Sequence, residues 1–69
     1  MLLSPDDIAR RIQYARRPGW LVWHGRQTRQ FWAVALWTRG SIGMISAADP
    51  DALEAAMSAF EMLHPKPTQ

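Results

Sequence analysis

The sequence predicts an α+β fold in which one helix, three antiparallel strands and a second helix follow one another, with both helices packed on one face of the sheet. Two helix-start signatures stand towards the ends of the chain, three strand-like runs lie between them, and the links between the runs are short. A chain of 69 residues has room for one domain. We expect this single domain over residues 1–64 and a flexible tail over residues 65–69.

The segment "LLSPDD" begins the first predicted helix. Ser4 suits the N-cap because its hydroxyl can accept a hydrogen bond from a free backbone N–H. Pro5 suits the first helical position, where its missing N–H costs nothing, and the carboxylates of Asp6 and Asp7 favour the positive end of the helix dipole. The helix should run to about Arg17, because "PGW" then breaks the helical pattern.

The segment "DPDALEAAMSAFEML" begins a second helix by the same logic, with Asp49 as the N-cap and Pro50 in the first turn. Apolar side chains recur at helical spacing in this segment: Leu53, Ala56, Met57, Phe60 and Leu63. This spacing is typical of a helix that packs one face against a core, so we expect these side chains to face the sheet.

Three runs between the helices, residues 20–24, 30–37 and 41–47, are rich in aromatic and β-branched residues and are separated by turn residues. The links "GRQTR" and "TRG" are short, which favours antiparallel hairpins. The middle run should therefore be the central strand of a three-stranded meander.

The strand register decides which side chains share a face. We place Trp23 opposite Phe31 and Trp37 opposite Ser41, and side chains then alternate between faces. The face assigned to the helix-covered core carries Trp20, Val22, Trp32, Val34, Leu36, Ile42 and Met44. The second face carries Leu21, Trp23, Phe31, Ala33, Ala35, Trp37, Gly43 and Ile45. The sheet is apolar on both faces, so the second face is either an interaction surface or is covered by the first helix, the tail or a crossed packing.

Charge is unevenly distributed along the chain. Residues 8–48 contain seven arginines and no acid, whereas both ends are acidic. This pattern indicates either an anionic partner or acidic ends that fold back and neutralise the middle.

The composition argues against catalysis and against a bound metal or cofactor. The chain has no cysteine, and His24 and His64 lie far apart in the sequence. The predicted strands and their links contain no carboxylate that could orient His24 as a general base. We therefore expect a non-catalytic protein. We also expect a cytoplasmic one, because no apolar secretory segment or run of membrane-spanning length is present.

The leading hypothesis is a small interaction module that forms a homodimer through the second sheet face. A domain this small, without disulfides or metal, gains stability from a partner subunit, and interface cores favour aromatic and apolar residues over acids. The predicted partner-binding residues are Leu21, Trp23, Phe31, Ala33, Ala35, Trp37 and Ile45.

The alternative hypothesis is binding of DNA or single-stranded RNA. Trp23, Phe31 and Trp37 would stack on bases, and five arginines would contact phosphates or an acidic protein partner: Arg10, Arg17, Arg26, Arg29 and Arg39. The order of elements resembles that of the double-stranded-RNA-binding domain, a family that grips phosphates with a basic start to its last helix. Here the corresponding segment "DPDALE" is acidic, so the resemblance is one of topology and does not favour duplex RNA.

Overall fold

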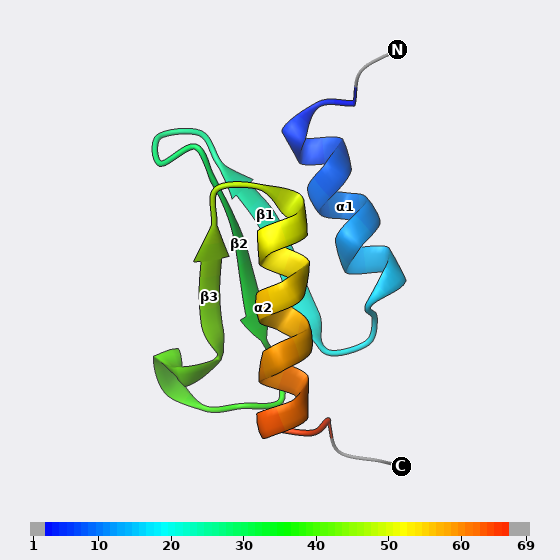
Figure 1. The fold of residues 1–69 in the computed structure, drawn as a ribbon, viewed down its shortest axis with the longest axis vertical. Coiled ribbons are helices and arrows are strands. Elements are labelled where there is room, and N and C mark those ends of the chain that lie inside the picture. Colours follow the sequence, from blue (N-terminus) through cyan, green and yellow to red (C-terminus); the bar gives the residue numbers. More distant parts are fainter. Residues whose placement is uncertain (1–2, 67–69) are drawn as a thin grey trace.

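The computed structural model describes residues 3–66 and shows the predicted order of elements (Figure 1). Helix α1 (Pro5–Ala15) is followed by strands β1 (Trp20–Gly25) and β2 (Gln30–Ala35), the short 3-10 helix η1 (Gly40–Gly43), strand β3 (Met44–Ala47) and helix α2 (Pro50–Leu63). The three strands form an antiparallel sheet in the order β1-β2-β3. The predicted α+β class is confirmed. Residues 67–69, most of the predicted tail, lie outside the described residues.

Both helices begin where their capping residues predict. The Oγ of Ser4 accepts a hydrogen bond from the backbone N–H of Asp7 at 3.2 Å, and Oδ1 of Asp49 accepts one from the N–H of Ala52 at 2.8 Å. Helix α1 ends at Ala15, two residues before the predicted end. Gly19 then follows with a φ of +107°, and a Cβ on it would lie 3.0 Å from the Trp37 ring. Glycine is therefore required where the chain turns into β1.

The register of the first hairpin differs from the prediction by one residue. Trp23 pairs with Trp32, not with Phe31, and Gly25 pairs with Gln30. The predicted pairing of Val34 with Met44 is correct. Because side chains alternate with period two, the one-residue error leaves β1 on the faces we assigned and reverses the faces of β2 and β3.

The central strand is also shorter than predicted. It ends at Ala35, whose carbonyl oxygen accepts from both the backbone N–H and the Oγ1 of Thr38, at 3.2 Å and 2.9 Å. These bonds turn the chain away from the sheet. Residues 36–43 form a longer connection through η1, and β3 begins only at Met44.

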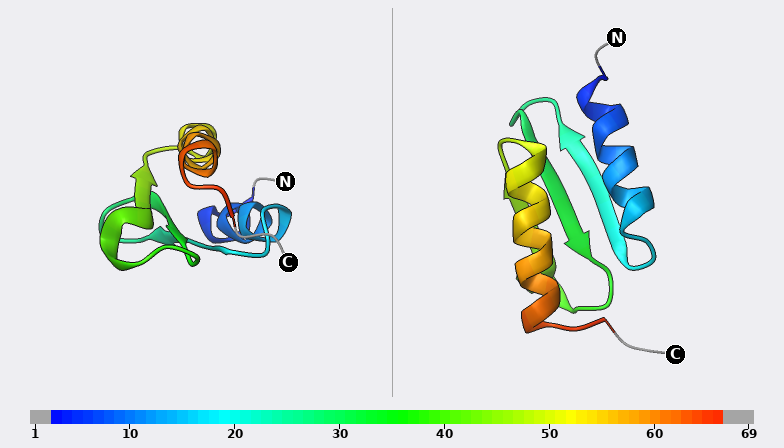
Figure 2. Two further views of the ribbon diagram at one scale, coloured as in Figure 1. Left: turned by 90° about the horizontal axis from the view of Figure 1, so that it is seen from below. Right: turned by 45° about the vertical axis from the view of Figure 1, so that its right-hand side comes forward.

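Both helices lie on the same side of the sheet, as predicted (Figure 2). Helix α1 packs on β1, and α2 packs on β3 and β2. The core between the layers consists of Ala9, Ile12, Trp20, Val22, Phe31, Ala33, Ala35, Leu53, Met57 and Phe60. The predicted helix positions Leu53, Met57 and Phe60 are therefore confirmed, whereas Leu63 is 77% exposed.

Two of the four tryptophans belong to this core region. The rings of Trp20, Trp37 and Phe60 meet edge to face, with centroids 5.2–5.9 Å apart. The Nε1 of Trp20 donates to Glu61 and that of Trp37 donates to the carbonyl oxygen of His64, so both polar ring atoms are paired. Trp23 and Trp32 lie on the other side of the sheet.

Candidate binding face

The side of the sheet away from the helices is an open face made of Leu21, Trp23, Trp32, Val34, Met44 and Ser46. Leu21 and Met44 are about half exposed, at 46% and 48%. Beyond one end of the strands, Leu36 and Ile42 extend the apolar surface, at 61% and 59% exposed. An antiparallel sheet with one solvated face usually carries polar side chains there, so this open apolar face is a candidate binding surface.

Trp23 and Trp32 form a nearly parallel pair on the open face. They are cross-strand neighbours, their ring centroids are 6.3 Å apart and their planes differ by 11°. The Nε1 of Trp32 donates to the Oγ1 of Thr28 at 3.1 Å, which fixes the orientation of this indole. Gly25 makes room for this arrangement, since a Cβ there would lie 2.7 Å from Thr28 Oγ1 and 3.2 Å from Trp32 Nε1. The Trp32 indole is therefore held in one orientation beside Trp23.

The hairpin tip beside this pair carries Arg26 and Arg29, both exposed. The N–H of Arg29 donates to the carbonyl oxygen of Gly25 at 2.8 Å, closing a four-residue link. Arg29 has a φ of +57°, which costs a side chain-bearing residue about 1–2 kcal/mol relative to the right-handed region. Glycine or asparagine would fit this backbone better, so the arginine is placed at the tip against the preference of the turn.

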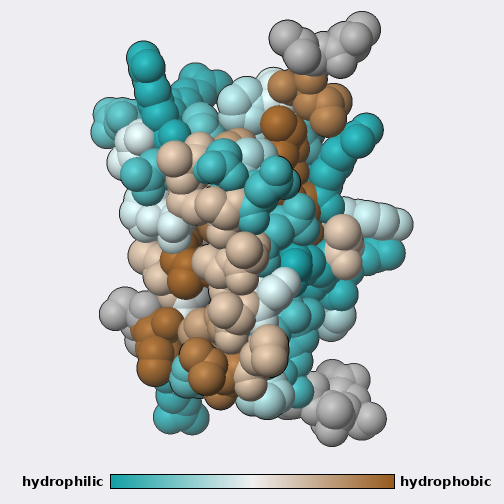
Figure 3. Space-filling view, viewed as in Figure 1, coloured by the Kyte–Doolittle hydropathy of each residue, from teal (hydrophilic) through white to brown (hydrophobic). Residues whose placement is uncertain are grey.

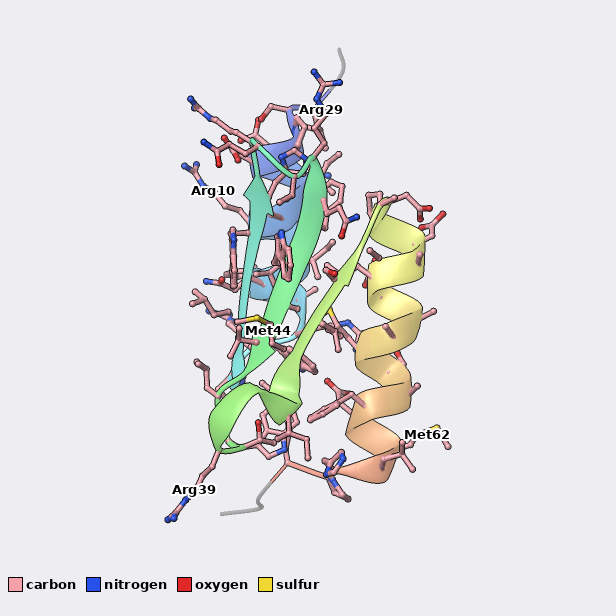
Figure 4. The ribbon with its side chains drawn as sticks, turned by 90° about the vertical axis from the view of Figure 1, so that its left-hand side faces the viewer. Arg10, Arg29, Arg39, Met44 and Met62 are labelled. Atoms are coloured by element: carbon pink, nitrogen blue, oxygen red, sulfur yellow. The ribbon has the colours of Figure 1, made fainter. Side chains whose placement is uncertain are left out.

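The acids are confined to the helix layer, whereas cationic side chains occur both on α1 and on the links between the strands. All six acids belong to α1, to α2 or to the N-cap of α2, and none lies on a strand or on a link between strands. Arg29 lies at one end of the sheet and Arg39 at the other, and Arg10 projects like Met44 to the side away from α2 (Figure 4). Figure 3 shows the side of the molecule that carries α2. Hydrophilic surface lies along this helix, and apolar surface lies near η1 and near the C-terminal end of α2. The strands that form the open face thus carry no acid, and Arg29 and Arg39 lie at its two ends, while Asp6 of α1 lies near the hairpin tip on the helix side.

Two acids of α2 fold back onto the basic segment, and they neutralise only part of it. Arg16 lies between α1 and α2 and forms ion pairs with Glu54 and Glu61, each at 3.5 Å. Lys66 also pairs with Glu61, and the guanidinium of Arg17 lies 3.8 Å from the centroid of the Tyr14 ring. Within residues 3–66 no ion pair involves the arginines at positions 10, 26, 29 and 39.

A shallow depression lies on the helix side of the hairpin, lined by Pro5, Asp6, His24, Arg26 and Arg29. His24 packs its ring edge against Phe31, with centroids 4.7 Å apart. No cluster of three or more His, Asp or Glu side chains able to hold a metal ion occurs in the described part of the chain. His24 therefore has a packing role that accounts for its position.

The structure places the predicted partner-binding residues on two different sides of the sheet. Leu21 and Trp23 lie on the open face, as predicted. Phe31, Ala33 and Ala35 are buried in the core, and Ile45 and Trp37 are half-buried against it, so their predicted outward position is wrong. The one-residue register error is the reason, because it exchanges the two faces of β2 and β3. Of the predicted cationic contacts, those at positions 10, 26, 29 and 39 are exposed and lack acidic partners, whereas Arg17 stacks on Tyr14.

Trp32, Val34 and Met44 are the open-face residues that we assigned to the core. The signal that would have found them is the length of the tip. A four-residue link closed by a backbone bond from Arg29 to Gly25 pairs Gly25 with Gln30, which fixes the observed register. The segment "GRQTR" predicts a five-residue link, and the additional residue is what places Trp23 opposite Phe31 in the predicted register.

The fold and the open face define a small two-layer α+β protein with one uncovered, acid-free sheet face. No protein-family model matches the chain, and neither the curated proteins nor the solved structures contain a match to it. Neither α1 nor α2 has the length and apolar character that spanning a bilayer requires.

Proposed function

We propose that this protein is a non-catalytic module that binds single-stranded nucleic acid on its open sheet face. The observation that carries the proposal is the parallel Trp23–Trp32 pair, which lies on an acid-free face next to the arginines of the hairpin tip. Proteins that bind single strands without strict sequence preference combine aromatic rings that stack on bases with a basic path for the phosphates.

Each part of the face has a role in this proposal. Trp23, which is 36% exposed, stacks on a base, and the Trp32 ring lies nearly parallel to it on the neighbouring strand. Arg26 and Arg29 contact the phosphates that flank this base, and Arg39 contacts the strand at the far end of the sheet. The aliphatic side chains between them contact the sugars and the remaining base faces.

The strained backbone of Arg29 supports a role for its guanidinium. A left-handed residue other than glycine persists where something other than turn stability favours it, and such positions are concentrated at functional sites. Contact with a phosphate gives a reason for arginine at this position that the fold by itself does not provide.

A second candidate function is protein assembly through the same face, which is the homodimer hypothesis with corrected residues. The aliphatic side chains of the face and of the adjoining connection favour it, since Leu21, Leu36, Ile42 and Met44 are each about half exposed or more. Ala33 and Ala35, which the predicted dimer face included, are buried, however, and the exposed face is instead built of large side chains.

Binding of fluorescently labelled oligothymidylate and oligouridylate at low salt tests the proposal. We expect Trp23→Ala to weaken binding about 5-fold to 150-fold, the range that corresponds to the loss of one base stack. Tyr14→Ala is the control, because Tyr14 is a 65% exposed ring that belongs to α1 and not to the sheet, and this variant should bind like the wild type. Absence of wild-type binding to either oligonucleotide at low salt would remove the proposal.

A further inference from the structure

The two outer strands of the sheet differ in how their edges are protected. Backbone groups on an antiparallel strand alternate between the neighbouring strand and the free edge. The backbone N–H of Val22 on β1 points to the free edge and donates to Oε1 of Gln13 at 2.8 Å. Helix α1, which packs on β1, thus covers this edge and occupies its central donor.

Strand β3 has no such cover. The N–H of Val22 points to the free edge of β1, so the backbone groups of its partner Ala33 point to β3 and meet those of Ile45. By the same alternation, the N–H and C=O groups of Met44 and Ser46 point away from the sheet. Both residues are exposed, and among residues 3–66 no hydrogen bond to these outward backbone groups is formed. Figure 4 looks onto this side of the molecule, where β3 lies in front of the other two strands.

Apart from its short length of four residues, β3 lacks the devices that protect an open edge. Natural edge strands carry lysine, proline, a bulge or an inward-pointing charge that prevents pairing with another strand. Here the strand reads Met-Ile-Ser-Ala and has regular pairing with β2 along its length. Unprotected backbone donors and acceptors of this kind bind another β-strand.

A second copy of β3 fits this edge better than an arbitrary strand. In a two-fold antiparallel pair centred on Ile45, Met44 of each copy lies opposite Ser46 of the other. The outward N–H of each of these residues then faces the outward C=O of its partner, and the two can form hydrogen bonds. The same arrangement brings the segment before β3, which carries Arg39, beside the segment after β3, which carries Asp49 and Asp51. All three charged side chains are exposed, and their charges are complementary.

We propose that the protein forms a two-fold dimer by pairing β3 with the β3 of a second copy, giving a continuous six-stranded sheet. Because α1 covers the edge of β1, each copy has one free sheet edge, and the dimer uses both of them. The assembly is therefore closed and does not add a third chain. The helices of both copies lie on one side of the joined sheet and the two open faces lie side by side on the other. The dimer therefore leaves the open face free for a ligand.

Sedimentation velocity without nucleic acid tests the dimer through Ser46→Pro. Proline removes the outward N–H of Ser46 and no bond to β2, so the monomer should keep its circular dichroism spectrum. We expect the dimer dissociation constant to rise tenfold or more, because each copy loses a donor and gains a ring at the interface. Ser46→Ala keeps the N–H and should dimerise like the wild type.

A charge exchange provides a second test that does not depend on proline. Arg39→Glu should weaken the dimer, because it places a carboxylate beside the acids of the second copy. Combining Arg39→Glu with Asp51→Arg should restore it. A wild type that stays monomeric at high concentration would overturn the proposal. So would a dimer that Val34→Glu on the open face disrupts and that Ser46→Pro leaves intact, since that result assigns the contact to the face.

Discussion

The indole Nε1 of Trp20 donates a hydrogen bond of 2.7 Å to Oε2 of Glu61, joining the first residue of β1 to the last turns of α2. The same carboxylate pairs with Arg16 and with Lys66, each at 3.5 Å. Glu61 thus links α1, the sheet, α2 and the segment that follows α2. Burial raises the pKa of Glu61, but the bond from Trp20 and the charges of Lys66 and Arg16 outweigh it, so its pKa lies below the ordinary value.

The lowered pKa of Glu61 predicts how stability depends on pH. A carboxyl group whose pKa is lower in the folded state stabilises the fold above its ordinary pKa of 4.5, and this contribution is lost as pH falls through the folded-state pKa. Urea unfolding measured across acidic pH should therefore show a smaller loss of stability for Glu61→Gln than for the wild type. Parallel curves for the two proteins would show that this carboxylate does not carry the effect.

Phe60→Ala should destabilise the protein by about 3–5 kcal/mol, because it opens a cavity between Trp20 and Trp37. Leu63→Ala is the control on the same helix. Leu63 is 77% exposed, and its truncation should change stability by less than about 0.5 kcal/mol. Equal thermal melting of the two variants would contradict the packing of α2 on the sheet.

Glutamate at two adjacent positions of β2 tests the observed register. Ala35 is 1% exposed, so Ala35→Glu buries an unpaired carboxylate in the core and should unfold the protein. Val34 lies on the open face, where the carboxylate of Val34→Glu reaches solvent and the fold should persist. Circular dichroism distinguishes the two, and the opposite result would restore the register predicted from the sequence.

Arg29→Gly should stabilise the monomer by about 1 kcal/mol, because glycine adopts a φ of +57° without the steric cost that arginine bears. Arg26→Gly is the matched control. The backbone of Arg26 is not left-handed, so there the added chain entropy of the unfolded state should destabilise the protein by up to about 1 kcal/mol. Chemical unfolding of both variants measures the difference, and destabilisation by Arg29→Gly would contradict the strain.

The salt dependence of oligonucleotide binding should fall when the tip loses its charges. For single strands, the logarithm of the affinity falls against that of the salt concentration with a slope of about −0.7 per phosphate contacted. The combination of Arg26→Ala with Arg29→Gly should therefore make the slope shallower by roughly 1.4, which is about 0.7 for each lost phosphate contact. Arg17→Ala removes a charge that stacks on Tyr14 and should leave the slope unchanged.

Local chemistry in the sequence was sufficient to predict the elements. Ser4 and Asp49 mark the helix starts because a cap is made within one turn, and Leu53, Met57 and Phe60 mark the buried stripe because helical spacing is a local property. The composition also predicts more apolar surface than two helices can cover. The structure has such an exposed apolar face, although several of its residues differ from those predicted.

Which side of β2 is buried was decided by the tertiary structure. A strand that is apolar on both sides has no hydrophobic pattern that fixes its register. A difference of one residue in the length of the hairpin link therefore decides which side of the strand is buried. The bond from Arg29 to Gly25 sets that conformation, and Phe31, Ala33 and Ala35 then turn inward while Trp32 and Val34 turn outward. The convergence of Arg16, Trp20 and Lys66 on Glu61 also depends on the tertiary structure. Arg16 and Trp20 lie 45 and 41 residues before Glu61 in the sequence, so no local sequence pattern predicts their contact with it.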